Sequence, residues 1–92
     1  MSERIEAIIS GRVQGVMFRD FACRKARGLK LVGEVQNLDD GTVRVVAEGS
    51  RDLIEKYIEK LRDGSLLAHV EDVRVEWHSP TDAYRSFNIN YD

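Results

Sequence analysis

Cysteine is almost missing from this sequence. Cys23 is the only cysteine among the 92 residues, so neither an internal disulfide nor a cysteine-based zinc site can form. A sequence that does not rely on disulfides is typical of a reducing compartment, and we therefore expect a cytoplasmic location. Cys23 itself lies beside the apolar stripe of a predicted helix and is expected to be a small residue of the core.

Long hydrophobic runs are missing as well. No window of 18 residues is apolar, and no apolar segment of the kind found in signal peptides follows the first four residues. We therefore expect no signal peptide, no membrane span and no membrane partner. The length fits a single domain that comprises residues 1–92.

Charge is nearly balanced in total but unevenly distributed. The net charge is −2, which argues against a nucleic-acid partner. Residues 12–30 nevertheless carry six cations against one acid, Asp20. Two interpretations remain open: a solvated helix face whose later cations complement the helix dipole, or a positive field around an anion site. Arg12 is expected to be a surface residue.

Hydrophobic periodicity predicts five strands and two helices. Apolar residues alternate in the strands and recur every three or four positions in the helices. An Asp-Asp-Gly turn at 39–41 joins the second and third strands into a hairpin. The predicted strands are 4–10, 31–37, 42–48, a fourth around 73–77 and a fifth around 87–91, and the predicted helices are 18–29 and the segment between Ser50 and Gly64.

This order, βαββαβ plus a short C-terminal strand, predicts an α+β fold. The expected architecture is a ferredoxin-like split βαβ sandwich, an antiparallel sheet with both helices on one face. A βαβ crossover returns the chain in the same direction, so the first and second strands end at the same edge of the sheet. The loop 11–18 should therefore lie about 10 Å from Asn37, with one strand between them.

That loop has the features of a phosphate site. Gly11 and Gly15 allow backbone conformations that point successive N–H groups inward, and the first turn of the following helix adds free N–H groups. Arg19 stands at that turn, and its planar guanidinium matches phosphate oxygens. On spacing alone, a tight turn with a surface arginine is an equally good interpretation.

Several kinds of chemistry are not indicated. The loop has neither the Gly-Lys-Ser/Thr of a nucleotide P-loop nor the Gly-x-Gly-x-x-Gly of a dinucleotide site. No cysteine precedes the arginine, so a phosphocysteine mechanism has no nucleophile. No carboxylate or histidine cluster suggests a metal. His69 and His78 are expected to be solvated loop residues, and Trp77 and Tyr91 to lie on the faces of the sheet.

Two segments resemble the signatures of the acylphosphatase family. The first is Val13-Gln14-Gly15-Val16-Met17-Phe18-Arg19, and the second is Gly33-Glu34-Val35-Gln36-Asn37-Leu38-Asp39-Asp40-Gly41-Thr42-Val43. The closing Phe87-Asn88-Ile89-Asn90-Tyr91 is similar to the last strand of the family. The resemblance covers essentially the whole chain, and both signatures stand in the right order for the predicted topology.

The resemblance implies a metal-independent and cofactor-free hydrolase that splits acyl phosphates into a carboxylate and phosphate. It implies that Arg19 binds the phosphoryl group and that Asn37 holds the attacking water. It also implies that the phosphoryl group is bound by the backbone N–H groups of Gln14, Gly15, Val16, Met17 and Phe18. The expected partners are small acyl phosphates, with phosphate as product or inhibitor, and a monomer is expected.

Two positions depart from the family pattern. Glu34 stands where an aromatic residue is usual, so a charge replaces an apolar contact near the second strand. Lys30 stands where glycine is usual, just after the first helix. If Lys30 adopts a left-handed conformation, the cost is about 1 kcal/mol. The alternative is that the helix ends earlier, at Gly28.

Two other functions compete with the enzyme. RNA-recognition modules share the βαββαβ order, but the third strand has no aromatic residue on which bases could stack. A module that binds phosphate or a carboxylate without hydrolysis is the stronger alternative. The presence of both Arg19 and Asn37 favours the enzyme.

Overall fold

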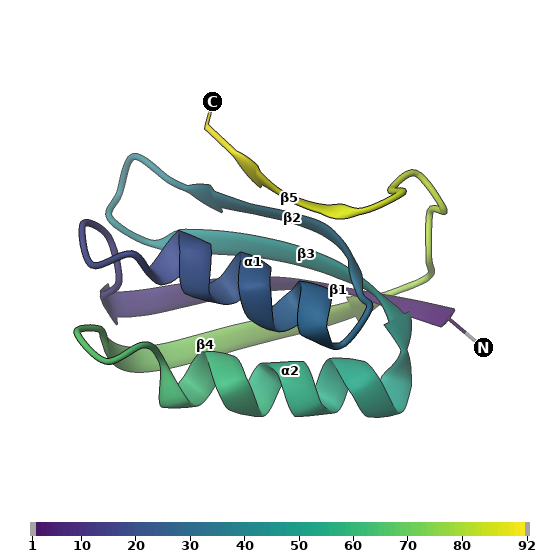
Figure 1. Ribbon diagram of the computed structural model, residues 1–92, viewed down its shortest axis with the longest axis horizontal. Helices are drawn as coiled ribbons and strands as arrows, with labels where there is room; N and C mark the ends of the chain where they lie inside the picture. Colours follow the sequence, from purple (N-terminus) through teal and green to yellow (C-terminus); the bar gives the residue numbers. More distant parts are fainter. Residues whose placement is uncertain (1, 92) are drawn as a thin grey trace.

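The computed structural model describes residues 2–91 and contains the predicted five strands and two helices. The elements follow one another in the expected order (Figure 1). No helix among these residues is long and apolar enough to cross a membrane. The elements are β1 (Ser2–Arg12), α1 (Phe18–Gly28), β2 (Val32–Asn37), β3 (Val43–Ser50), α2 (Arg51–Asp63), β4 (His69–His78) and β5 (Phe87–Asn90). His69 and His78 are exposed, as expected, but they are the end residues of β4 rather than loop residues.

The sheet has the strand order β4-β1-β3-β2-β5. The prediction that it is antiparallel is wrong at one edge, because β5 pairs with β2 in parallel, from Gly33 with Phe87 to Gln36 with Asn90. The reason is the path of the chain. Since β4 runs antiparallel to β1 and ends beside its start, the loop after His78 crosses the end of the sheet at which β2 also begins. The strand that follows must then run in the same direction as β2.

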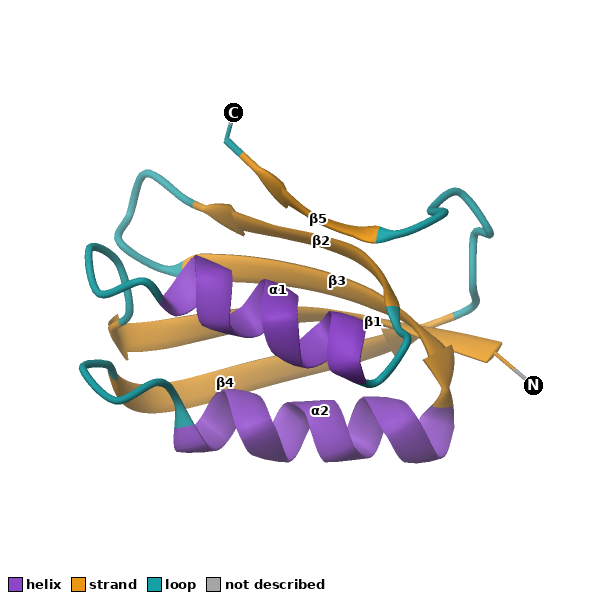
Figure 2. Cartoon of the chain, in the orientation of Figure 1, coloured by secondary structure: helices purple, strands orange, loops and turns teal. Residues whose placement is uncertain are grey.

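Both helices cover the same face of the sheet (Figure 2), as predicted. The inward residues of β1 alternate with outward ones, and Ile5, Ala7 and Ile9 are fully buried. Tyr57 of α2 is also fully buried, and its hydroxyl donates a 2.8 Å hydrogen bond to the Ala22 carbonyl of α1. This bond satisfies the buried hydroxyl and joins the two helices.

Cys23 is buried in this core, as expected. Burial raises the pKa of its thiol, because a thiolate is disfavoured where water is excluded. The thiol therefore has the properties of a packing residue rather than of a nucleophile.

The turn that follows helix α1 contains a left-handed residue that is not glycine. Lys30 has a φ of 59°, and its N–H donates to the Arg27 carbonyl while the Leu31 N–H donates to the Ala26 carbonyl. This pair of bonds is the Schellman arrangement, which normally places glycine at the left-handed position. The helix itself ends at Gly28, one residue before the predicted end. Both features that the sequence offered as alternatives are therefore present: Lys30 is left-handed, and the helix ends at Gly28.

Candidate active site

The loop between β1 and α1 is held at both ends by the core. Val13 and Phe18 are each only 1% exposed, and the Phe18 ring lies 5.6 Å from the ring of Phe21. Between these anchors the backbone turns sharply through two left-handed residues, Gly15 (φ 74°) and Met17 (φ 62°). A methionine in this region is strained, and such strain is concentrated at functional sites.

The N–H groups of this loop are left without protein partners. Within residues 2–91, no backbone N–H from Gln14 to Phe18 donates to a backbone or side-chain acceptor, and the helical ladder starts with the bond from the Phe21 N–H to the Met17 carbonyl. Consecutive free N–H groups at the positive end of a helix dipole form a site for an anion. The loop therefore has the local geometry that a phosphoryl group requires.

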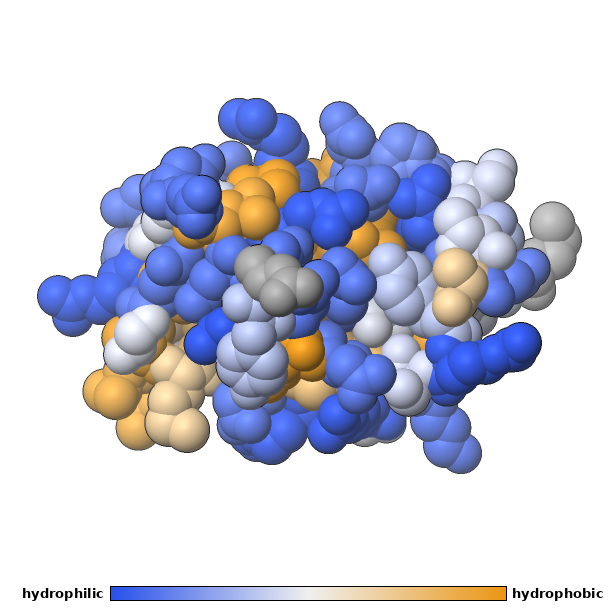
Figure 3. Space-filling model, turned by 90° about the horizontal axis from the view of Figure 1, so that it is seen from above, coloured by the Kyte–Doolittle hydropathy of each residue, from blue (hydrophilic) through white to orange (hydrophobic). Residues whose placement is uncertain are grey.

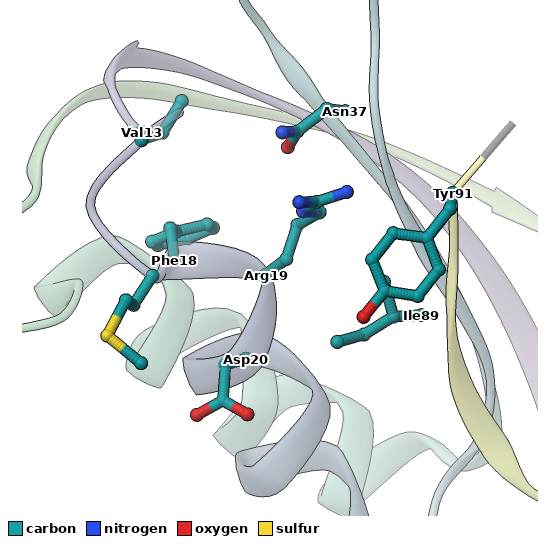
Figure 4. Close-up of a pocket in the computed structure, with 9 residues that line it drawn as sticks. Val13, Phe18, Arg19, Asp20, Asn37, Ile89 and Tyr91 are labelled. Atoms are coloured by element: carbon teal, nitrogen blue, oxygen red, sulfur yellow. The ribbon is translucent and has the colours of Figure 1, made fainter.

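Arg19 extends from the first turn of α1 toward the sheet (Figure 4). None of the carboxylates in the described part of the chain lies within ion-pair distance of its guanidinium. The guanidinium instead lies 5.0 Å from the centre of the Tyr91 ring. Its positive charge is therefore available to a ligand in the same pocket.

Asn37 is the last residue of β2, and β3 separates it from β1 as predicted. Its side-chain amide points toward the Arg19 guanidinium (Figure 4). The Oδ1 atom of Asn37 is buried and accepts no hydrogen bond from any described residue. A buried acceptor without a donor is unfavourable, and a water molecule that donates to Oδ1 would satisfy it.

Arg19 and Asn37 open onto one pocket of about 380 Å³. Of the loop residues predicted to contact phosphate, Gly15, Met17 and Phe18 line this pocket. Gln14 and Val16 do not. The complete lining is Val13, Gly15, Met17, Phe18, Arg19, Asp20, Asn37, Ile89 and Tyr91.

Gln14 and Val16 direct their side chains elsewhere. Val16 packs against the hydrophobic core. The side-chain amide of Gln14 donates 2.8 Å hydrogen bonds to the carbonyls of Leu38 and Thr42. The prediction is that Gln14 and Val16 bind the phosphoryl group through their backbone N–H groups alone. The positions of their side chains therefore do not conflict with it. No local pattern in the sequence points to the contact of Gln14.

Four lining residues are not among the predicted site residues: Val13, Asp20, Ile89 and Tyr91. Ile89 comes from β5 and Tyr91 directly follows that strand. Tyr91 was expected on a face of the sheet, whereas it is 76% exposed beside the pocket. The parallel pairing explains this position. Since β5 and β2 finish at the same end of the sheet, Tyr91 lies near Asn37. Trp77, in contrast, belongs to β4 as expected.

One acid, Asp20, lines the pocket. Its carboxylate points away from Arg19 (Figure 4) and pairs with Arg24 at 2.9 Å. Both partners are exposed, so the pair adds little stability, but it offsets the negative charge beside the anion site. Among the residues that the structure describes, no three His, Cys, Asp or Glu side chains form a group suited to a metal ion.

Glu34 lies away from the pocket. Its carboxylate pairs with Arg44 at 3.5 Å and accepts a 3.3 Å hydrogen bond from the side chain of Asn90. The charge that departs from the family pattern is thus compensated locally. It is not among the residues that line the site.

The fold and the pocket together define an α+β structure with a candidate anion site at the end of the sheet where β1, β2 and β5 end. A family model described as Acylphosphatase matches residues 5–89. The acylphosphatase of Salinibacter ruber is 46% identical over 87 residues, 95% of this chain and 92% of that protein. The crystal structure of acylphosphatase from Bacillus subtilis matches with a TM-score of 0.94 at 36% identity, covering 97% of this chain and 99% of that one.

The chain therefore belongs to the acylphosphatase family, enzymes that hydrolyse acyl phosphates. This confirms the family, the fold and the enzyme class expected from the two signatures. A similar unit also occurs within a larger protein: the crystal structure of T. kodakarensis HypF matches with a TM-score of 0.86 at 31% identity, covering 98% of this chain but 12% of that one.

Proposed function

We propose that the pocket between Arg19 and Asn37 is where the acyl phosphate is hydrolysed. The loop N–H groups from Gln14 to Phe18 and the guanidinium of Arg19 bind the phosphoryl oxygens. Asn37 orients the attacking water. The observation that carries this assignment is that three groups without hydrogen-bond or ion-pair partners among residues 2–91 lie around the same pocket: the Arg19 guanidinium, the loop N–H groups and the buried Asn37 amide oxygen.

The reaction needs few groups. Oxygen of the water attacks phosphorus while the bond between phosphorus and the acyl oxygen breaks, and the carboxylate leaves with the electron pair. A carboxylate is a weak base, so no general acid is required at the leaving group. A phosphoryl oxygen takes the proton of the water, and the products are a carboxylate and dihydrogen phosphate.

Charge stabilisation accounts for most of the catalysis. Phosphoryl transfer passes through a loose transition state in which charge spreads over the equatorial oxygens, and positioned donors stabilise it. Arg19 and the loop amides are such donors. A neutral amide such as that of Asn37 orients water without repelling the phosphoryl group, as a carboxylate would.

Phosphate, as the product, binds the same N–H groups and inhibits competitively. The protein acts as a monomer in the cytoplasm. It hydrolyses small acyl phosphates that differ in their acyl groups. The face along the β5 edge supports the monomer, because it is mostly hydrophilic with separate hydrophobic areas (Figure 3). We also propose that residues 1–92 form one domain.

A module that binds phosphate or a carboxylate without hydrolysis is the alternative to be tested. Hydrolysis of benzoyl phosphate without added metal separates the two functions. We expect turnover by the wild-type chain and its loss in Arg19→Ala and Asn37→Ala. Phosphate binding by the wild type without any turnover would support the binding module.

A further inference from the structure

The side chain of Gln14 connects two segments that are distant in sequence. Gln14 belongs to the phosphate-binding loop, and its Nε2 donates to the carbonyl oxygens of Leu38 and Thr42, each at 2.8 Å. These carbonyls stand at the two ends of the turn between β2 and β3, which begins directly after Asn37. The loop and the turn lie at the same end of the sheet (Figure 1).

The turn that Gln14 contacts is itself well ordered by hydrogen bonds. The Leu38 N–H donates to the Thr42 carbonyl at 2.9 Å, and the Gly41 N–H donates to the Leu38 carbonyl at 3.2 Å. Asp40 accepts further bonds from the N–H and the hydroxyl of Thr42. Each carbonyl that Gln14 reaches is therefore already fixed within the turn, so the two bonds hold the loop against a defined element.

The two halves of the proposed site come from different elements. The N–H groups and Arg19 form one continuous segment, whereas Asn37 lies on β2, with β3 in between. Val13, Val16 and Phe18 anchor the loop in the core. Among residues 2–91, however, the side-chain hydrogen bonds between the loop and the turn after β2 are the two that Gln14 donates. The bonds from Gln14 thus cross the gap between the group that binds phosphate and the group that orients water.

We propose that Gln14 is a positioning residue that sets the placement of Asn37 relative to the bound phosphoryl group. The inference rests on the proposed function of the pocket. In-line attack tolerates little error, and a misplacement of about 1 Å can cost 10²-fold in rate. Gln14 acts through its side chain on Asn37, while its backbone N–H stays available to the phosphoryl group.

The test removes the two donors but keeps the length of the side chain. Gln14→Met has no donor, and Gln14→Glu, ionised at neutral pH, turns a carboxylate toward two carbonyl oxygens. With benzoyl phosphate we expect kcat to fall by about 10-fold or more in both variants. In Gln14→Met the inhibition constant of inorganic phosphate should stay within about twofold, because the phosphate-binding segment remains intact and no charge is added.

Asp40→Ala is the matched control. It removes the bonds that Asp40 accepts within the turn but leaves both bonds from Gln14. We expect its kcat to stay close to that of the wild type. If Asp40→Ala lowers kcat as much as Gln14→Met does, the stiffness of the turn matters rather than the connection, and the inference is overturned. It is also overturned if Gln14→Met loses thermal stability while kcat stays unchanged.

A measurement without turnover separates this inference from the proposed function. Inorganic phosphate added to the wild type should shift the amide NMR signals of both the loop 14–18 and the turn 38–42. In Gln14→Met, or in Gln14→Glu if the methionine variant does not fold, only the loop signals should shift. Turn signals that move equally in the variant, or not at all in the wild type, would refute the connection. Absence of benzoyl phosphate hydrolysis in the wild type would instead refute the proposed function.

Discussion

The guanidinium of Arg19 lies 5.0 Å from the centre of the Tyr91 ring, although the two residues stand near opposite ends of the chain. A cation over an aromatic face is attracted by the ring quadrupole. Tyr91 directly follows β5, whereas Arg19 starts on α1, and both residues line the same pocket. We therefore expect the ring to help orient the guanidinium.

Removal of the ring should weaken this orientation. We expect Tyr91→Ala to lower kcat/KM for benzoyl phosphate by about 2-fold to 5-fold, the equivalent of an exposed cation–π contact of about 0.5–1 kcal/mol. Tyr91→Phe keeps the ring and should resemble the wild type. Equal losses in the two variants would show that the hydroxyl, not the ring, is responsible.

The charge and shape of Arg19 should both be required. Arg19→Ala is expected to lower kcat by about 10³-fold or more, as for other arginines that stabilise a phosphoryl transition state. Arg19→Lys keeps the charge but loses the planar pair of donors, so it should restore little activity. Steady-state hydrolysis of benzoyl phosphate measures both effects. Near wild-type turnover in Arg19→Lys would show that a point charge is sufficient.

Lys30 offers a gain in stability. Its left-handed conformation is strained for any residue with a Cβ, so Lys30→Gly should raise the free energy of unfolding by about 0.5–1 kcal/mol after the greater flexibility of the unfolded chain is included. Urea denaturation at constant pH measures the change. Lys30→Ala is the control: it removes the charge but retains the Cβ, and it should give no comparable gain.

Glu48 should make stability depend on pH. Burial alone would raise the pKa of this 3% exposed carboxyl, but hydrogen bonds from the hydroxyl and N–H of Thr81 and from the N–H of Asp82 outweigh burial and lower the pKa. A lowered pKa in the folded state stabilises the protein above the pKa of the unfolded chain, and this stabilisation is lost as pH falls through the folded value.

The corresponding variant is Glu48→Gln. It should reduce the free energy of unfolding at pH 7 by about 1–3 kcal/mol, because one carboxylate oxygen becomes an amide nitrogen that cannot accept these bonds. The difference from the wild type should shrink as pH falls below about 4. Glu59→Gln, at an exposed position of α2, serves as the control. A difference that stays constant with pH would contradict the role of the charge.

Local patterns were sufficient for much of this molecule. Alternating and helical periodicity located the elements, and the loop glycines with Arg19 made an anion site one of two interpretations of the loop on spacing alone. The partner of the last strand could not be found in this way, because the pairing of β5 depends on the end of the sheet at which the chain crosses over, not on the residues of β5. Tyr91 and the side-chain contact of Gln14 were missed for the same reason: both join segments that only the folded chain brings together.

The most direct test of the proposed site compares Arg19→Ala with Asn37→Ala for both kcat on benzoyl phosphate and inhibition by inorganic phosphate. If Arg19 binds the phosphoryl group and Asn37 orients water, both variants lose most of their turnover, but only Arg19→Ala loses affinity for phosphate. Equal weakening of phosphate inhibition in the two variants would contradict this division of roles.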